Sequence, residues 1–235
     1  MLINIKYFKG LDSLRFFAAY LVVLHHAEQI RMKYGLFNLK EYSLFNNGGI
    51  AVTFFFVLRG FLISYLLFKE HGESSTISVK KFYYRRILRI WPLYFLLVII
   101  GTLVLPYVLD FIGYSYIMPY NFNDVIYYYI LFSPFMVNIL YGHHLIEPLW
   151  SIGVEELFYI VWAPLFKFLR KYILPIIIIV IFVRCLFIYL SFLGFFDPVI
   201  ERLINMLRFE AMAIGALGSY LVYNYRNILS NFLFS

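Results

Sequence analysis

Charged residues and cysteine are scarce in this sequence. Only 14% of its 235 residues are charged, and its single cysteine, Cys185, excludes an intrachain disulfide. That charged share is about half of the usual share in soluble domains, so polar side chains are too few to cover a water-soluble globule. Disorder is excluded as well, because disordered segments contain few aromatics, whereas 22% of this chain is aromatic. The composition therefore predicts a membrane-embedded protein.

Several motifs of common enzyme classes are absent too. The sequence has no HExxH, no Walker glycine loop and no G-x-S-x-G, which argues against metalloprotease, NTPase and α/β-hydrolase chemistry. His143, His144 and Glu147 resemble metal ligands in their spacing, but no further ligand cluster accompanies them, so no metal is predicted. The net charge of +7 indicates cytoplasmic loops and anionic lipid headgroups, and no nucleic acid, as partners.

Six apolar stretches are long enough to cross the hydrocarbon core of a bilayer, which takes roughly 20 residues. They lie near residues 12–30, 50–68, 90–109, 149–166, 173–196 and 203–223. We therefore expect an all-α, multi-pass transmembrane helical bundle of about six spans, which forms one membrane domain over residues 1–235. For the least apolar first stretch, the alternative is a secretory signal peptide with Lys6 and Lys9 as its basic region, although no small-x-small cleavage site follows His26.

Lys and Arg in the connections predict the orientation of these spans. They gather before the first stretch, at residues 69–89 and at residues 167–171, and none occurs between Arg89 and Lys167. The segment without basic residues is expected to leave the cytoplasm and return once, so the N-terminus and both basic connections are predicted to be cytoplasmic. Residues 122–141, which are rich in tyrosine, are then expected to form an interfacial or re-entrant helix, because tyrosine favours the headgroup level.

Arg15 and His26 are ionisable residues inside the first expected span, where such groups are costly and often functional. Eleven positions separate them, so on a helix they return to within roughly 20° of one face and lie about 16 Å apart along the axis. This spacing predicts a polar stripe that crosses most of the membrane. The alternative is that Arg15 extends to the headgroups while His26 only bonds to a neighbouring helix.

A cluster of basic residues precedes Trp91 at the start of the third expected span. Arg86 and Arg89 are one helical turn apart, a spacing with which two guanidinium groups can bind the phosphates of an anionic cytosolic ligand. The alternative is that the cluster only anchors the helix to anionic lipid.

Two adjacent carboxylates, Glu155 and Glu156, open the fourth expected span. Acidic residues in a first turn are favoured by the helix dipole, which is one explanation. Because the two lie about 100° apart around the helix, at most one faces a given site, and Ser151 shares a face with Glu155. In the predicted topology His26 and Glu155 both lie toward the outer leaflet, where a base and an orienting carboxylate can meet.

Four ordered segments resemble the integral-membrane acyltransferase-3 family. They are residues 10–15 with His26, then 54–63, 85–94 and 149–159, and residues 207–215 resemble a later segment. The resemblance implies a membrane O-acyltransferase in the cell inner membrane. It implies acetyl-CoA or another acyl-CoA as the cytosolic donor, and a hydroxyl of a cell-surface or exported polysaccharide or glycolipid as the acceptor.

The resemblance also implies roles for the residues singled out above. His26 corresponds to the base that takes a proton from the acceptor hydroxyl, and Arg15 accompanies it to hold the donor or to stabilise negative charge on the carbonyl oxygen. Arg86 and Arg89 correspond to the pair that binds the phosphates of coenzyme A. Glu155 corresponds to the acidic position of the fourth segment.

The chain departs from the family pattern at several points. Arg59 stands where the family usually has Ser, and Ala51 replaces a frequent glycine. Glu156, Ser151 and Arg59 are expected to be accessory residues. Relatives generally carry about ten helices, so the six expected here indicate a truncated, compact or inactive member that lacks the C-terminal helices. A non-catalytic transporter or export subunit for polysaccharide stays open as the alternative.

Overall fold

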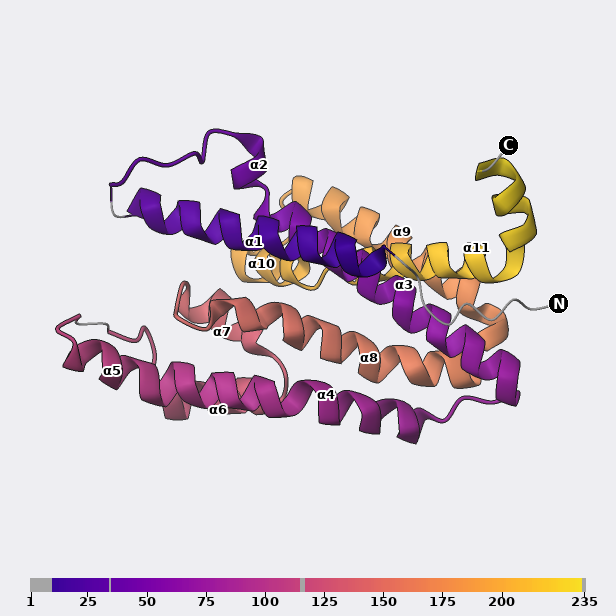
Figure 1. Ribbon diagram of the computed structural model, residues 1–235, viewed down its shortest axis with the longest axis horizontal. Helices are drawn as coiled ribbons and strands as arrows, with labels where there is room; N and C mark the ends of the chain where they lie inside the picture. The colour runs from indigo at the N-terminus through magenta and orange to yellow at the C-terminus, as the bar shows by residue number, and fades with distance from the viewer. Residues whose placement is uncertain (1–9, 34, 115–116, 234–235) are drawn as a thin grey trace. The chain divides into compact units, whose positions relative to one another are not determined.

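The computed structural model describes residues 10–33, 35–114 and 117–233, and these contain helices and turns but no strand. Figure 1 shows the ribbon. The helices are α1 (Leu11–Lys33), α2 (Ser43–Asn46), α3 (Gly48–Ser74), α4 (Val79–Ile99), α5 (Leu105–Phe111), α6 (Phe122–Ile130), α7 (Pro134–Tyr141), α8 (Trp150–Phe168), α9 (Ile173–Phe192), α10 (Pro198–Met206) and α11 (Phe209–Leu233). Short helical turns lie at Ile100–Val104, Glu147–Leu149 and Arg170–Tyr172. The all-α prediction is thus confirmed for the described residues.

Four helical segments of the described chain are long and apolar enough to cross a membrane. They are Gly48–Ser74, Val79–Phe111, Glu147–Phe168 and Arg170–Phe192. Four of the expected spans coincide with them. The other two expected spans fall on α1 and on α10 with α11, and the latter stretch is interrupted between the two helices at Leu207 and Arg208. The count of six spans therefore stays a prediction.

The chain divides into two compact units. Unit 1 comprises the chain up to Leu66 together with the part from Glu210 onward, and unit 2 comprises Leu67–Phe209. The single domain expected over residues 1–235 stays a prediction. Lys6 and Lys9, on which the predicted orientation of the N-terminus depends, lie outside the described residues.

In unit 1, α3 and α11 pack backbone against backbone. A Cβ atom at Gly60 would collide with the main chain of Met212, and one at Gly215 would collide with the carbonyl group of Val57. Glycine allows this close approach because it has no side chain, which is how membrane helices often associate.

Helix α1 holds the connection that follows it in unit 1. The Nδ1 atom of His25 lies 3.0 Å from the carbonyl oxygen of Phe45. Glu28 is buried, accepts a hydrogen bond of 2.6 Å from the amide of Leu39 and pairs with Arg31 at 3.1 Å. These contacts fix residues 35–47 against α1.

In unit 2, α8 runs alongside α4 (Figure 1). We call residues 69–85 and 167–172 the basic end of this unit. Here Arg170 Nη1 lies 2.9 Å from His71 Nδ1, and Arg85 pairs with Glu70 at 3.3 Å. The two basic connections, which the sequence predicts to lie on one side of the membrane, contact each other here.

We call residues 117–149, together with Tyr94 and Val98 of α4, the aromatic end of unit 2. The single helix expected at residues 122–141 is instead two short helices, α6 and α7. Phe132, which lies between them, has a left-handed φ of 53°. Pro134 at the start of α7 has no amide hydrogen and disfavours helical geometry in the residue before it. The helix therefore ends before Pro134 and the chain begins a second one.

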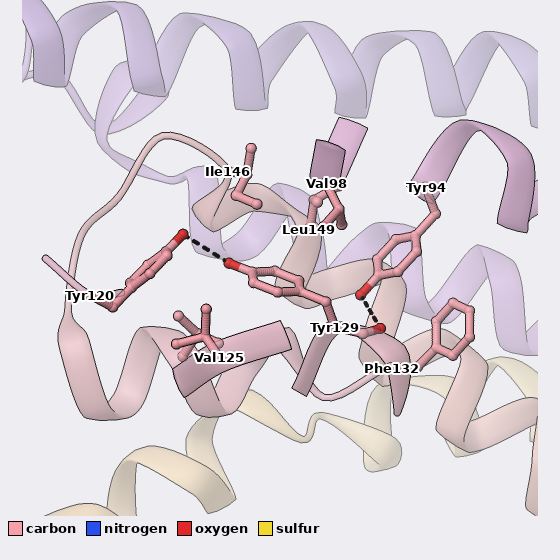
Figure 2. Packing of buried hydrophobic residues seen from close by; sticks show 9 residues of the cluster. Tyr94, Val98, Tyr120, Val125, Tyr129, Phe132, Ile146 and Leu149 are labelled. Carbon is pink, nitrogen blue, oxygen red and sulfur yellow. Dashed lines mark hydrogen bonds between the residues drawn. The ribbon is translucent and has the colours of Figure 1, made fainter. Parts of the chain in front are cut away.

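Buried tyrosines form the centre of the aromatic end (Figure 2). Tyr94 donates a hydrogen bond of 3.0 Å to the carbonyl oxygen of Tyr129. The hydroxyl oxygens of Tyr120 and Tyr129 are 3.1 Å apart, and that of Tyr129 is 3.2 Å from Nε2 of His144. Tyrosine can occupy such a core because its hydroxyl finds partners there.

Candidate active site

Helix α4 carries the basic pair of the candidate site. The helix begins after Ser78, whose hydroxyl oxygen accepts a hydrogen bond of 3.4 Å from the amide of Lys81. Arg86 and Arg89 lie one turn apart on this helix, as the sequence predicts. Arg86 is half-buried and Arg89 is exposed.

Helix α8 carries the acidic pair. Both Glu155 and Glu156 are buried, with only 8% and 5% of their surface exposed. Glu155 accepts a hydrogen bond of 3.3 Å from the hydroxyl of Tyr159, and Glu156 accepts one of 3.3 Å from the indole nitrogen of Trp91. The two carboxylates thus have different neighbours, as their angular separation on the helix predicts.

Ser151 has a local contact at the start of α8. Its hydroxyl donates a hydrogen bond of 3.1 Å to the carbonyl oxygen of Pro148. This is a local bond from a side chain to the carbonyl group three residues earlier, of a kind that serine commonly makes. An accessory role for Ser151 stays a prediction.

The basic and acidic segments meet where α4 packs on α8. The guanidinium carbon of Arg86 lies 5.2 Å from the ring centre of Tyr159 and 5.5 Å from that of Phe82. These distances are within the range in which the negative face of an aromatic ring attracts a cation. Arg86 and Glu155 are therefore linked through one side chain, that of Tyr159.

Tyr159 and Trp91 are the site residues that the sequence analysis did not assign a role. Tyr159 follows Glu155 by four positions, and side chains at that spacing are neighbours on a helix, so it was within reach of prediction. Trp91 lies 65 positions from Glu156. Only the packing of the two helices brings that pair together.

Arg15, His26 and Arg59 belong to unit 1. Arg15 pairs with Asp12 at 2.8 Å, and 31% of its side chain is exposed. His26 is exposed, and its ring packs edge-on against that of His25 with centres 5.7 Å apart. Arg59 is half-buried in α3, beside the contact at Gly60. Because helix α1 runs unbroken from residue 11 to 33, the predicted spacing of Arg15 and His26 holds. The meeting of His26 with Glu155, which lies in unit 2, stays a prediction.

The three residues with metal-like spacing have separate surroundings. His143 pairs with Glu147 at 2.6 Å, whereas His144 is buried next to Tyr129. Burial lowers the pKa of His144, and the carbonyl group of Gly142, to which it is hydrogen-bonded, opposes that effect. Among the described residues, no group of three His, Cys, Asp or Glu side chains is placed to hold a metal ion.

These features define a class: a helical, membrane-type protein in which Arg, Tyr, Trp and Glu side chains meet between long apolar helices. A family model described as an acyltransferase domain, that of the acyltransferase-3 family, matches residues 8–235. The chain therefore belongs to the acyltransferase-3 family, which confirms the resemblance of its motifs.

Curated relatives carry consistent names. A putative peptidoglycan O-acetyltransferase of Bacillus subtilis, YrhL, is 29% identical over 173 residues, which are 72% of this chain and 25% of that protein. The O-acetyltransferase OatA of Staphylococcus aureus is 28% identical over 169 residues, which are 70% of this chain and 25% of that protein. The alignments thus cover about a quarter of the length of these relatives. No solved structure matches the chain.

Proposed function

We propose that this chain is the membrane part of an O-acyltransferase, which transfers an acetyl or other acyl group from cytosolic acyl-CoA to a hydroxyl of an exported glycan. Membership of the acyltransferase-3 family and the names of the relatives support this proposal. The observation that carries it is the link from Arg86 through Tyr159 to Glu155, because it joins a phosphate-binding residue type to a buried carboxylate.

The donor would bind through its phosphates at Arg86 and Arg89. A guanidinium group that lies on an aromatic ring uses its face for that contact, and its N–H groups point outward in the plane, where phosphate oxygens can accept them. The ring of Phe82 supports Arg86 in the same way as that of Tyr159. Arg89, one turn further along α4, is exposed and adds a second cation.

The transfer itself would use His26 as the base. Its neutral imidazole takes the proton of the acceptor hydroxyl, and the oxygen forms a bond to the thioester carbonyl carbon. Arg15, which lies about 16 Å from His26 along the axis of α1, would hold the donor at a distance from the reacting carbonyl group. The carbon–sulfur bond then breaks, and the leaving thiolate takes the proton back from the imidazolium. In this proposal Glu155 orients His26.

The orientation follows from the charge distribution. The basic end of unit 2 and the N-terminus would face the cytoplasm, where acyl-CoA is found, and six helices with the interfacial α6 and α7 would lie in the inner membrane. The meeting of residues 69–85 with residues 167–172 supports this arrangement, because both segments then lie on one side.

Binding of acetyl-CoA to the purified protein in detergent or nanodiscs, measured by calorimetry, tests the donor site. Arg86→Ala is expected to weaken binding at least tenfold, because a hydrogen-bonded charge contact contributes about 1.5–3 kcal/mol. Arg85→Ala is the matched control, because Arg85 carries the same charge on the same helix but pairs with Glu70 at the basic end. Equal losses in both variants would mean that acetyl-CoA is attracted only by general positive charge. A transporter for polysaccharide is expected to show no binding of acetyl-CoA in this measurement.

The base assignment has its own test. His26→Ala is expected to abolish acetyl transfer to a glycan acceptor, while the amount of membrane-inserted protein stays the same. Full transfer activity in His26→Ala would overturn the assignment of His26 and leave the donor site unaffected.

A further inference from the structure

Tyr159 has two distinct neighbours at the contact between α4 and α8. Only 1% of its surface is exposed. The face of its ring lies 5.2 Å from the guanidinium carbon of Arg86, and its hydroxyl donates a hydrogen bond of 3.3 Å to Oε2 of Glu155. Its ring also packs edge-on against Phe82, with centres 6.2 Å apart and planes at 83°.

The two contacts use different parts of the side chain. The attraction to Arg86 depends on the electrons of the ring and needs no hydroxyl. The bond to Glu155 depends on the hydroxyl, and a hydrogen bond to a buried carboxylate is both strong and directional. The hydroxyl therefore restricts the orientation of the carboxylate, while the ring restricts the position of the guanidinium.

The neighbouring carboxylate provides a contrast. Glu156 accepts its hydrogen bond from Trp91 on α4. Each carboxylate thus has its own aromatic donor, and the donor to Glu155, Tyr159, also lies against Arg86.

We propose that Tyr159 is a positioning residue that couples donor binding to catalysis, with its ring holding Arg86 for the donor phosphates and its hydroxyl orienting Glu155. This inference rests on the proposed function, because it assigns Arg86 to the donor and Glu155 to the reaction.

Two variants of the protein separate the two parts of the side chain. Tyr159→Phe keeps the ring and removes the hydroxyl, so kcat for acetyl transfer is expected to fall about 10- to 100-fold. The KM for acetyl-CoA is expected to stay within twofold. Tyr159→Leu removes both parts, so kcat falls similarly and the KM for acetyl-CoA rises about 3- to 30-fold as the cation contact is lost.

Tyr83→Phe is the matched control. Tyr83 also bridges the two helices, because its hydroxyl donates a hydrogen bond of 2.7 Å to the carbonyl oxygen of Ile160. Tyr83 is outside the proposed site, so removal of its hydroxyl is expected to leave kcat and KM within twofold of the wild type. A loss of kcat in Tyr83→Phe equal to that in Tyr159→Phe would show that helix contact alone is responsible, and would overturn the proposal.

A double-mutant cycle tests the partner of the hydroxyl. In a Glu155→Gln background, Tyr159→Phe is expected to reduce kcat by less than twofold further, because the carboxylate that it orients is already gone. If Tyr159→Phe does not fold, the kcat of the Glu155→Gln variant tests the proposal instead. A folded Glu155→Gln protein with the kcat of the wild type would overturn it.

Failure of this inference is distinguishable from failure of the proposed function. A wild-type protein that neither binds acetyl-CoA nor transfers acetyl groups contradicts the proposed function. The role of Tyr159 alone is contradicted by a different set of results. In that set the wild type binds acetyl-CoA and transfers acetyl groups, Arg86→Ala raises the KM for acetyl-CoA, and Tyr159→Phe has the kcat of the wild type.

Discussion

The two ends of unit 2 are held together by different interactions. At the basic end, Arg85 and Glu70 form a pair in which 60% and 24% of the side chains are exposed. At the aromatic end, Tyr129 is fully buried and bonded to Tyr120 and His144. Exposed ion pairs contribute little to stability, whereas buried networks with satisfied hydrogen bonds contribute much. The comparison indicates that stability resides at the aromatic end and that the exposed ion pair at the basic end contributes little to it.

The candidate site lies between these ends along α4 and α8. Arg86 is half-buried and directly follows the exposed Arg85, and the next residues along the helix lead to Trp91 and then to buried Tyr94. Hydrogen bonds and charges are stronger in such a partly buried position than at an exposed surface. A position at this transition combines access for the donor with the rigidity of a core.

The largest effect is expected from Tyr129→Ala at the aromatic end. This substitution removes a fully buried ring and the hydrogen bonds of its hydroxyl, so it should lower the free energy of unfolding by about 3–5 kcal/mol. Denaturant unfolding of the detergent-solubilised protein measures it. The control is Tyr127→Ala, because Tyr127 lies on the same helix and is 46% exposed. A similar loss in both variants would refute the view that the buried cluster stabilises this end.

A smaller loss is expected from Gly153→Ala in α8. A Cβ atom there would lie 2.6 Å from the carbonyl oxygen of Phe132 and 2.6 Å from Cδ of Pro134, and a backbone carbonyl yields little. We expect the free energy of unfolding to fall by about 1–3 kcal/mol, measured in the same titration. Gly218→Ala serves as the control, since its Cβ would make an ordinary contact of 3.6 Å with Phe61. Unchanged stability in Gly153→Ala would mean that α8 shifts easily against residues 132–134.

Sequence patterns predicted the parts of the fold that depend on local composition. The apolar stretches at residues 50–68, 90–109, 149–166 and 173–196 coincide with helices of spanning length, because length and hydropathy are properties of the segment itself. The break near residue 132 was only partly predictable. Ser133 and Pro134 mark an interruption, but the left-handed backbone of Phe132, which makes two helices of one, depends on packing around it.

The candidate site shows the same division. The different directions of Glu155 and Glu156 follow from helix geometry and were predicted. Their partners were not, because Trp91 comes from another helix and its side chain reaches Glu156 only through tertiary packing. The metal-like spacing at residues 143–147 does not bring its residues into one site. His143 is exposed and the adjacent His144 is buried. Spacing predicts which residues share a face, but not what lies opposite that face.

A pH effect of intermediate size is expected at His144. Its pKa is lowered by burial, so the unfolded chain binds a proton more readily than the folded chain. The contribution of neutral His144 to the free energy of unfolding is therefore fully present above the ordinary histidine pKa of about 6.5. It is lost as the pH drops below that value, by at most about 1.4 kcal/mol per pH unit. Glu147 opposes this shift and His143 adds to it. Unfolding titrations at several values between about pH 7.5 and 5 measure how the free energy of unfolding changes with pH. If His144→Phe shows the same slope as the wild type in this window, His144 is not its source.

The smallest effect is expected at the basic end, from Arg85→Ala. The Arg85 side chain of the pair with Glu70 is mostly exposed, and exposed pairs contribute about 0–1 kcal/mol, so the free energy of unfolding should change by less than about 0.5 kcal/mol. Raising the salt concentration should reduce even this difference, because screening weakens exposed pairs. Glu70→Gln is the companion variant, and it also tests the hydrogen bond of 2.9 Å that Glu70 accepts from the amide of Ser78 at the start of α4. A loss above about 2 kcal/mol in Arg85→Ala would erase the contrast between the two ends, because the basic end would then be as structural as the aromatic one.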